Sequence, residues 1–444
     1  MTFNSSPIEN DLTIFWFRRD LRLKDNAGLY HALHENPKVL AVFIFDIQIL
    51  EKLEEKADGR VDFIHQSLKV LKHELEELGS SLLVLHGNPL EIFKDMNPRA
   101  VYTNHDYEPY ARERDERVNK ILEGKGIPFR TFKDQVIFDR DEIVKDDNTP
   151  YTVFTPYSRK WKSKLSEFYL RGYPTEKYFQ RFAKVRPLPF PTLEEIGFKP
   201  TAALFPERVI PRVVISNYDN QRNFPSIRGT TRLSVHLRFG TVSIRKLAQV
   251  AVKTSDSWLN ELIWREFYQM ILWYFPHVET HAFKPAYGRI EWRNEPGEFN
   301  AWCEGKTGYP MVDAGMRELN TTGFMHNRVR MITATFLTKH LLIDWRWGEA
   351  YFASKLLDYD LASNNGGWQW AAGSGCDAAP YFRIFNPEAQ AKKFDHLLKY
   401  IKKWIPELET IEYPKPIVEH KFARERAIQV YKTALRELSS SAHT

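Results

Sequence analysis

The stretch VLAVFIF (residues 39–45) decides the fold class of the first third of the chain. It is a short apolar run of strand length. Four more runs of this kind are TIFWF (13–17), SLLVLHG (81–87), AVYTN (100–104) and PFRTFKD (128–134). Helix-like segments separate the runs, notably residues 60–79 and 106–124. Strand–helix alternation at this spacing predicts a parallel sheet wrapped by helices. No GxGxxG follows any of the runs, so the pattern does not support a dinucleotide site of that kind.

The remainder of the chain changes character in two steps. Residues 139–200 include the proline-rich RPLPFPTLEEIGFKP and are predicted to form a long connector. Beyond about residue 200 the apolar periods become helical, and ten of the twelve tryptophans lie there. We therefore predict an α/β domain with a Rossmann-like parallel sheet over residues 1–138, a connector over 139–200, and an all-α domain over 201–444.

Composition limits the class of protein. The chain has 444 residues, of which 27% are charged, and a formal net charge of +6, which fits a nucleic-acid partner without requiring one. Cys303 and Cys376 lie far apart, which favours a reducing compartment and argues against a disulfide framework or a cysteine-ligated metal. The first residues show no secretory signal, and no apolar stretch is long enough to span a membrane. We expect a soluble, cytoplasmic protein.

A polar group of residues interrupts the apolar helix predicted at SWLNELIWREFYQMILWYF (257–275). Glu261, Trp264, Arg265 and Tyr268 share one face by their spacing of three, four and seven residues. One interpretation is a buried ion pair with aromatic packing. The other is a polar cavity with an aromatic wall, which would suit a flat heterocycle. This helix alone does not separate the two.

A second long helical period, PMVDAGMRELNTTGFMHNRVRMITATFLTKHLL (310–342), places Asn327, Arg330 and Met331 on one face. An asparagine donates and accepts hydrogen bonds at once, which suits the edge of a base or an imide. The alternative is an ordinary core amide, and for a lone asparagine that interpretation is favoured.

The segment GTTRLSVHL (229–237) is predicted to be a turn that leads into a helix. Thr230, Thr231 and Ser234 offer hydroxyl and backbone N–H groups at the helix start, and Arg232 adds positive charge. This combination could cradle a diphosphate. Helix starts rich in threonine and serine are usually only caps, and that alternative stays open.

Asp358 and Asp360 are separated by one residue. No histidine or further carboxylate is spaced to complete a metal site with them, and we predict no metal centre. The two acids could act in acid–base chemistry, pair with arginines, or accept hydrogen bonds from a cofactor ring. Directly after them, LASNNGGWQWAAGSGCDAAPYF (361–382) combines paired asparagines, paired glycines and two tryptophans, a composition that a folding core rarely needs.

Together these segments resemble the DNA photolyase/cryptochrome family, and most closely its class I cyclobutane pyrimidine dimer photolyases. The matching segments, in the family order, are FWFRRDLRLKDN (15–26), GTTRLSVHLRFG (229–240), WLNELIWREFY (258–268), EGKTGYPMVDAGMREL (304–319), MHNRVRM (325–331), LLIDWRWGEAYF (341–352) and DYDLASNNGGWQWAAGSGCDAAPYFRIFNP (358–387). Seven matches in order over almost the whole chain make chance similarity a poor explanation.

The resemblance implies that FAD binds in the helical domain. The diphosphate or adenine side would contact Tyr218, Thr230, Thr231, Arg232, Leu233, Ser234 and Trp258. Arg330, Asp358, Asp360 and Asn364 would lie around the isoalloxazine ring, and Glu261, Arg265 and Tyr268 are further residues implied to bind FAD. Asn364 matches the family residue that faces flavin N5. Gly366 and Gly367 would let the backbone pass close to the flavin. Trp368, Trp345 and Trp292 match the tryptophan chain that carries electrons inward to reduce the flavin in light.

The resemblance also implies a substrate pocket for UV-damaged DNA. Trp264 and Trp370 would form its two walls, Glu261 would hydrogen-bond the pyrimidine dimer, and Asn327 and Met331 would line it. Arg222 and Arg328, with Arg238 and Lys393 as further candidates, would hold the DNA backbone. The implied enzyme is a deoxyribodipyrimidine photo-lyase, a carbon–carbon lyase. Light drives an electron from reduced FAD to a flipped-out dimer, the cyclobutane ring splits, and the electron returns.

Two features bear on the subfamily. His326-Asn327 stands where photolyases for (6-4) lesions typically carry two histidines, and plant-type cryptochromes often have aspartate at the position of Asn364. Both features favour repair of cyclobutane dimers over the alternative, a cryptochrome-type blue-light receptor without repair activity. Tyr110-Ala111 replaces the Asn-Glu pair of folate-binding relatives. A second, antenna chromophore is therefore expected to be a deazaflavin or a flavin in preference to methenyltetrahydrofolate, with an empty pocket as the alternative. We expect a monomer.

Overall fold

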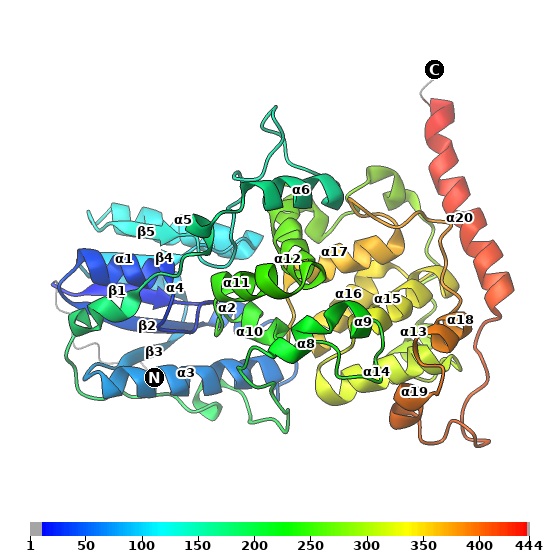
Figure 1. Ribbon diagram of the computed structural model, residues 1–444, viewed down its shortest axis with the longest axis horizontal. Coiled ribbons are helices and arrows are strands. Elements are labelled where there is room, and N and C mark those ends of the chain that lie inside the picture. The colour runs from blue at the N-terminus through cyan, green and yellow to red at the C-terminus, as the bar shows by residue number, and fades with distance from the viewer. Residues whose placement is uncertain (1–10, 442–444) are drawn as a thin grey trace. The chain divides into compact units, whose positions relative to one another are not determined.

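The computed structural model describes residues 11–441 (Figure 1). Contacts within the chain divide it into two compact units. The first comprises the described residues up to Glu142 together with Trp161–Ile210 and Leu233–Lys253, and the second comprises Ile143–Lys160, Pro211–Arg232 and the remainder from Thr254. Each unit combines stretches that are separate in the sequence, so the units do not test the predicted domain boundaries. The boundaries at residues 138 and 200 stay a prediction.

The first unit contains a five-stranded, all-parallel sheet. Its strands are β1 (Thr13–Phe17), β2 (Val39–Asp46), β3 (Leu82–Gly87), β4 (Ala100–Asn104) and β5 (Phe129–Phe132), in the spatial order β3-β2-β1-β4-β5. The register places Phe15 beside Ala41 on one neighbour and Tyr102 on the other. All five strands lie where the sequence predicts them, and the predicted α/β class of this region is confirmed.

Helices cover both faces of this sheet, which explains why β1 and β2 are buried along their whole length. The helices between strands are α1 (Ala27–Glu35), α2 (Ile47–Leu50), α3 (Gly59–Glu77), α4 (Pro89–Asp95) and α5 (Pro109–Glu123). Ile14 and Trp16 pack with Phe93 of α4 and Val118 of α5. On the other face, Gly28 of α1 lies so close to Phe15 that a β-carbon there would crowd the ring.

The predicted connector, residues 139–200, contains short helices instead of a single extended chain. They are α6 (Phe154–Lys164), α7 (Glu167–Leu170), η1 (Thr175–Arg181) and η2 (Glu194–Ile196). The first unit also includes α10 (Ser234–Arg238) and most of α11 (Ile244–Thr254).

The second unit is helical, as predicted (Figure 1). Its main helices are α8 (Arg212–Ser216), α9 (Tyr218–Gln221), α12 (Asp256–Tyr274), α13 (Pro296–Glu304), α14 (Pro310–Thr322), α15 (Asn327–Thr335), α16 (Trp345–Lys355), α17 (Leu361–Ala372), α18 (Pro387–Phe394), α19 (Lys399–Trp404) and α20 (His420–Ser441). Short turns η3 (Pro276–Glu279) and η4 (Pro285–Arg289) join them. Trp302, Phe336 and Trp368 belong to the largest core cluster of this unit.

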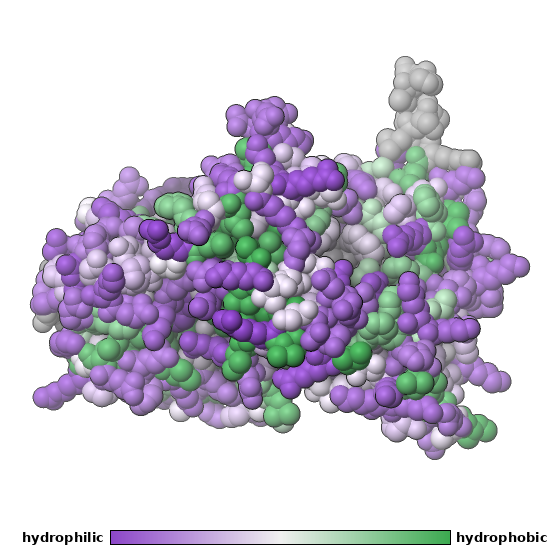
Figure 2. All heavy atoms as spheres, viewed as in Figure 1, coloured by the Kyte–Doolittle hydropathy of each residue, from purple (hydrophilic) through white to green (hydrophobic). Residues whose placement is uncertain are grey.

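The single helical period predicted over residues 310–342 is wrong in one respect. Gly323 adopts a left-handed conformation with φ of +65° and ends α14, and the His326 side chain caps the start of α15. The period then continues into a π-helical turn, η5 (Phe336–His340). In the part of the chain that the structure describes, no helix is long and apolar enough to cross a membrane. Hydrophilic residues cover most of the face drawn in Figure 2.

Candidate cofactor and substrate site

The polar face of α12 is held by a neighbouring short helix. Ser255 caps the start of α12, and Arg222, at the end of α9, forms an ion pair with the Glu261 carboxylate. Burial raises the pKa of Glu261, while Arg222 opposes this effect. Roughly a third of each of the two side chains stays exposed. Glu261 is therefore positioned at the edge of the helical core, where a ligand could replace Arg222 as its partner.

Trp264, one turn along α12, is stacked on an aromatic residue that the site prediction did not include. The ring of Phe154 lies parallel to it, with 3.7 Å between centroids and 4° between planes. Tyr268 follows at 5.4 Å in a tilted arrangement. Burial raises the pKa of Tyr268 well above its usual value, so its hydroxyl stays protonated at neutral pH. Arg265 is half-buried on the same helix.

Arg330 on α15 forms an ion pair with Asp358, at 3.0 Å between Nη2 and Oδ2. The guanidinium also donates through Nε to the Met325 carbonyl at 2.7 Å, which fixes its orientation. Asp360 has a structural task besides any cofactor contact, because its Oδ1 caps α17 by accepting from the Ser363 N–H at 3.1 Å.

Asn364 is oriented by an acid that sequence reasoning missed. Its Nδ2 donates to Oε1 of Glu349 at 2.7 Å and to the Glu349 carbonyl at 3.1 Å. The amide oxygen of Asn364 is therefore the group left to face a ligand. Burial and the nearby charge of Glu279 raise the pKa of Glu349 to about 6, although the bond from Asn364 opposes the shift. Glu349 lies fifteen residues before Asn364, and no local spacing rule connects the two.

The paired glycines of α17 have different environments. A β-carbon at Gly366 would overlap the Tyr268 ring, whereas one at Gly367 would meet no atom within 4 Å. The small size of Gly366 makes room for Tyr268, and the expectation that both glycines let the backbone pass close to a flavin stays a prediction. Gly367 is exposed and lies on α17 one turn after Asn364. These two residues mark an open side of the helix.

The three tryptophans of the predicted electron chain contribute to one cluster. Trp368 and Trp345 are buried in the main core of the second unit, and Trp292 packs against that core from its edge. Trp302, which the prediction omitted, is fully buried with its ring centroid 6.0 Å from that of Trp368. Trp370 is half-buried and packs against the same core. The cluster therefore runs from the centre of the unit to its surface.

The predicted substrate residues on α15 lie at its exposed start. Asn327 is exposed, and Met331 follows it by one turn. Arg328 donates to Asn223 Oδ1 at 2.6 Å, and its guanidinium lies 4.5 Å above the Phe394 ring. Burial and the positive charge of Arg222 lower the pKa of Arg328. The positive charges of Arg222 and Arg328 lie near each other here, which would favour the binding of an anionic ligand.

The predicted diphosphate segment is divided between the two units. Thr230, Thr231 and Arg232 belong to the second unit, whereas the buried Leu233 and the exposed Ser234 belong to the first. The Arg232 guanidinium lies 4.4 Å above the Phe324 ring. Of the other residues predicted on this side of FAD, Trp258 is buried in α12 and Tyr218 begins α9, and both belong to the second unit.

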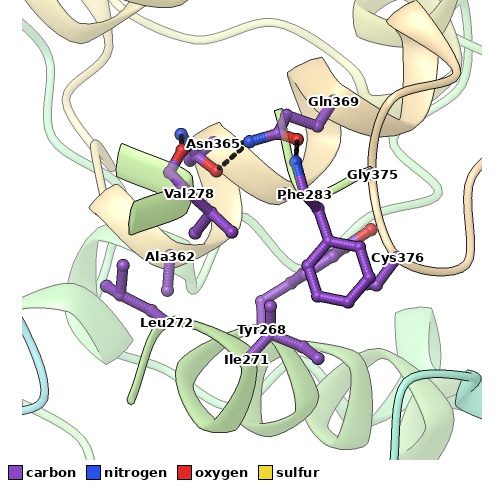
Figure 3. A pocket seen from close by; sticks show the side chains of 11 residues that line it. Tyr268, Ile271, Leu272, Val278, Phe283, Ala362, Asn365, Gln369, Gly375 and Cys376 are labelled. Atoms are coloured by element: carbon purple, nitrogen blue, oxygen red, sulfur yellow. Dashed lines mark hydrogen bonds between the residues drawn. The ribbon is translucent and has the colours of Figure 1, made fainter. Parts of the chain in front are cut away.

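A cavity between α12 and α17 is shown in Figure 3. Its residues come from the packed side of α17, including Asn365, Gly366 and Gln369, together with Tyr268 and Cys376. Gln369 closes one wall by donating to Asn365 Oδ1 at 3.1 Å (Figure 3). Because Asn364 and Gly367 do not line it, this cavity differs from the open side of α17.

The predicted antenna region lies in the first unit. The Tyr110 hydroxyl donates to Oδ2 of Asp46, at the end of β2, at 2.7 Å. Lys52 lies 5.3 Å above the Tyr110 ring, and Arg114 approaches the same carboxylate at 3.5 Å. Aromatic and charged side chains thus meet at the carboxyl end of a parallel strand, a common place for ligands in such sheets.

Comparisons with known proteins place these two units in one family. The family model for DNA photolyase matches residues 13–177, and the model for the FAD binding domain of DNA photolyase matches residues 258–412. A deoxyribodipyrimidine photo-lyase from Synechococcus is 38% identical over 96% of this chain and 98% of its own length.

Solved structures that are similar to this chain belong to photolyases as well. A bacterial class III photolyase from Agrobacterium tumefaciens has a TM-score of 0.85 and 31% identity, covering 98% of this chain and 99% of its own. An archaeal photolyase from Sulfolobus tokodaii, solved with two FAD molecules, has a TM-score of 0.80 and 34% identity, covering 95% of this chain and 100% of its own.

Proposed function

The chain belongs to the DNA photolyase family and is a light-dependent DNA repair enzyme, and from that premise we propose that it splits cyclobutane pyrimidine dimers. It would then act as a deoxyribodipyrimidine photo-lyase, a carbon–carbon lyase. The observation that carries the proposal is the open, polar side of α17 around Asn364 and Gly367, in a helix that is otherwise packed.

The residues on this side of the second unit fit a flavin. Gly367 leaves space for a flat ring, and Asn364 keeps its amide oxygen available because Glu349 holds its amide nitrogen. The Arg330–Asp358 pair offers a donor and an acceptor together, which suits the polar edge of an isoalloxazine ring. When FAD is bound and reduced, it supplies the electron that light makes available for repair.

The chain's own residues would bind and orient the dimer. Trp264 and Trp370 present flat apolar surfaces, which are suited to bases taken out of the duplex. Glu261 would hydrogen-bond the dimer once Arg222 is drawn away, and burial raises the pKa of its carboxyl. Arg222 and Arg328 would then bind the phosphates on either side of the lesion, so that affinity falls with added salt.

We further propose that an antenna chromophore of the flavin or deazaflavin type binds in the first unit. Support comes from the group of Tyr110, Asp46, Arg114 and Lys52, and from the Sulfolobus relative that contains two FAD molecules. No feature of residues 11–441 favours the alternative of a receptor without repair activity over the enzyme.

Lesion specificity tests this proposal. The reduced protein would be illuminated with matched oligonucleotides that carry either a cyclobutane dimer or a (6-4) lesion. We expect repair of the cyclobutane dimer alone, and a lower repair yield per bound FAD for Glu261→Gln. Repair of the (6-4) lesion alone, or full yield from Glu261→Gln, would contradict the assigned substrate or the assigned role of Glu261.

A further inference from the structure

The sequence prediction assigns no function to the segment YTVFTPYSRKW (151–161). In the structure, Phe154 of this segment packs on α12, the helix that carries Trp264. Residues 143–160 belong to the second unit, together with α12. Phe154 begins α6, and its ring covers one face of Trp264 at a centroid distance of 3.7 Å with the planes 4° apart. At this separation the two rings are in van der Waals contact, so no base fits between them.

Phe154 is held in place by neighbours on both sides. Its backbone N–H donates to Oδ2 of Asp377 at 3.1 Å. One turn later, Tyr157 is buried with 1% of its surface exposed, packs against Phe267 at 5.2 Å, and hydrogen-bonds the Glu266 carboxylate on α12. A ring anchored in this way is a fixed part of the wall. It differs from a movable lid, which would have few contacts at its base.

The anchoring also links the two predicted walls of the pocket. Asp377 lies seven residues after Trp370, in the segment that follows α17, while Phe154 supports Trp264 on α12. Phe154 thus contacts the first wall through its ring and the segment after the second wall through its backbone. Displacement of its ring would let Trp264 turn more freely, because the other aromatic contacts described for the indole are a tilted one with Tyr268 and an edge-on one with Phe267.

We propose that Phe154 is a positioning residue of the lesion-binding pocket, which fixes the plane of Trp264 and leaves the indole one face for the damaged base. This inference rests on the proposed function. It predicts that Phe154 affects the choice of damaged over undamaged DNA and acts only through Trp264. A flat ring at residue 154 is required, and apolar volume alone is insufficient.

The test is a double-mutant cycle on DNA binding, measured with the FAD-loaded protein in the dark at one salt concentration. Dissociation constants are determined for an oligonucleotide with a thymine dimer and for the same undamaged sequence. The variants are Phe154→Leu, Phe154→Tyr, Trp264→Ala and the double variant Phe154→Leu/Trp264→Ala. Phe168→Ala is the matched control, because that ring is 74% exposed. Phe154→Met replaces Phe154→Leu if the leucine variant does not fold.

We expect Phe154→Leu to lower the preference for dimer DNA by about two- to tenfold, the effect of losing one aromatic pair. Phe154→Tyr and Phe168→Ala should retain the wild-type preference. The double variant should bind like Trp264→Ala alone, because the two residues act as one unit.

Three results would overturn the inference. If Trp264→Ala lowers the dimer preference but Phe154→Leu does not, Phe154 has no positioning role although the proposed function stands. A higher preference in Phe154→Leu would mean that Phe154 blocks the pocket. If the wild-type protein shows no preference for dimer DNA, the proposed function fails and the inference fails with it.

Discussion

The two sides of α17 differ more than their sequence suggests. Asn365 points into the core, where its Nδ2 donates to the Val278 carbonyl at 2.8 Å, whereas Asn364 binds Glu349 at the open side. Gly366 accommodates an aromatic ring, and Gly367 faces open space. One side of the helix is therefore a packed surface, and the other is a candidate site.

The same contrast holds for the tryptophans. Trp368 is 2% exposed and packs edge-on against Phe352, whereas Trp370 is half-buried. Successive residues of a helix point about 100° apart, so neighbours of one type meet different surroundings. The doubled asparagines and glycines and the two tryptophans in residues 361–382 thus serve two sides of a helix, and each pair supplies a matched control for a test of function.

The largest expected difference lies between the tryptophans. Trp368→Ala should cost about 3–5 kcal/mol of unfolding free energy because it leaves a cavity in the core, and Trp370→Ala should cost clearly less. Urea unfolding followed by circular dichroism checks this. Trp368→Phe should also slow the light-driven reduction of bound flavin and spare repair by chemically reduced protein, while Trp370→Phe leaves that reduction rate unchanged. Equal effects of substitution at residues 368 and 370, in stability or in the rate of flavin reduction, would contradict the difference between the two tryptophans.

Alanine substitution of the two glycines should change the free energy of unfolding in opposite directions. Gly366→Ala places a methyl group against the Tyr268 ring and should destabilise the protein by about 1–3 kcal/mol. Gly367→Ala should stabilise the unliganded fold by up to about 1 kcal/mol, since alanine is the better helix former. It should nevertheless lower the FAD content, because the methyl group enters the open side. FAD content and urea midpoints of the two variants are compared. Normal FAD retention by Gly367→Ala would remove this side of α17 as the flavin contact.

The asparagines give a smaller contrast. Asn365→Asp turns a buried amide donor into a carboxylate facing the Val278 carbonyl, which should cost about 1–3 kcal/mol or more at pH 7. Asn364→Asp instead faces Glu349 in a partly exposed position, so repulsion should raise the pKa of that carboxyl pair. At pH 7, Asn364→Asp should therefore cost less unfolding free energy than Asn365→Asp. This cost should fall further as the pH is lowered towards 5. A pH-independent cost at residue 364 would contradict the contact with Glu349.

The smallest effect concerns Glu349 itself. Its pKa is raised to about 6 in the folded protein, from a usual value near 4.5. The folded state therefore holds this proton more tightly, and the resulting stability is complete below pH 4.5 and is lost as the pH rises through 6. This pH-dependent contribution to the free energy of unfolding amounts to about 1–2 kcal/mol, and Glu349→Gln should remove it. Unfolding free energies at pH 4.5, 5.5 and 7 check the sign, and an identical pH dependence of the two proteins would refute it.

Much of the fold is predictable from local patterns. Residues 39–45 are apolar throughout because helices cover both faces of the sheet, and the strands that start at residues 39 and 100 begin where predicted. The break after α14 was missed, since the apolar period continues across Gly323 although its left-handed backbone ends the helix. Glycine in a helical period is ambiguous until its neighbours are known.

The site is less predictable, because its contacts join distant segments. The spacing on α12 placed Glu261 and Trp264 on one face, but it could not reveal that Arg222 pairs with the first and Phe154 with the second. Those partners lie 39 and 110 residues away in sequence. An aromatic residue in a segment interpreted as a connector carries no signal of its own.

The most direct test of the account is repair in light. The purified protein, with its flavin reduced, is mixed with a thymine-dimer oligonucleotide, and thymine absorbance is followed under blue light and in the dark. We predict that absorbance recovers in light alone. Bound FAD without any recovery in light would contradict a cyclobutane dimer photolyase and would favour a photoreceptor.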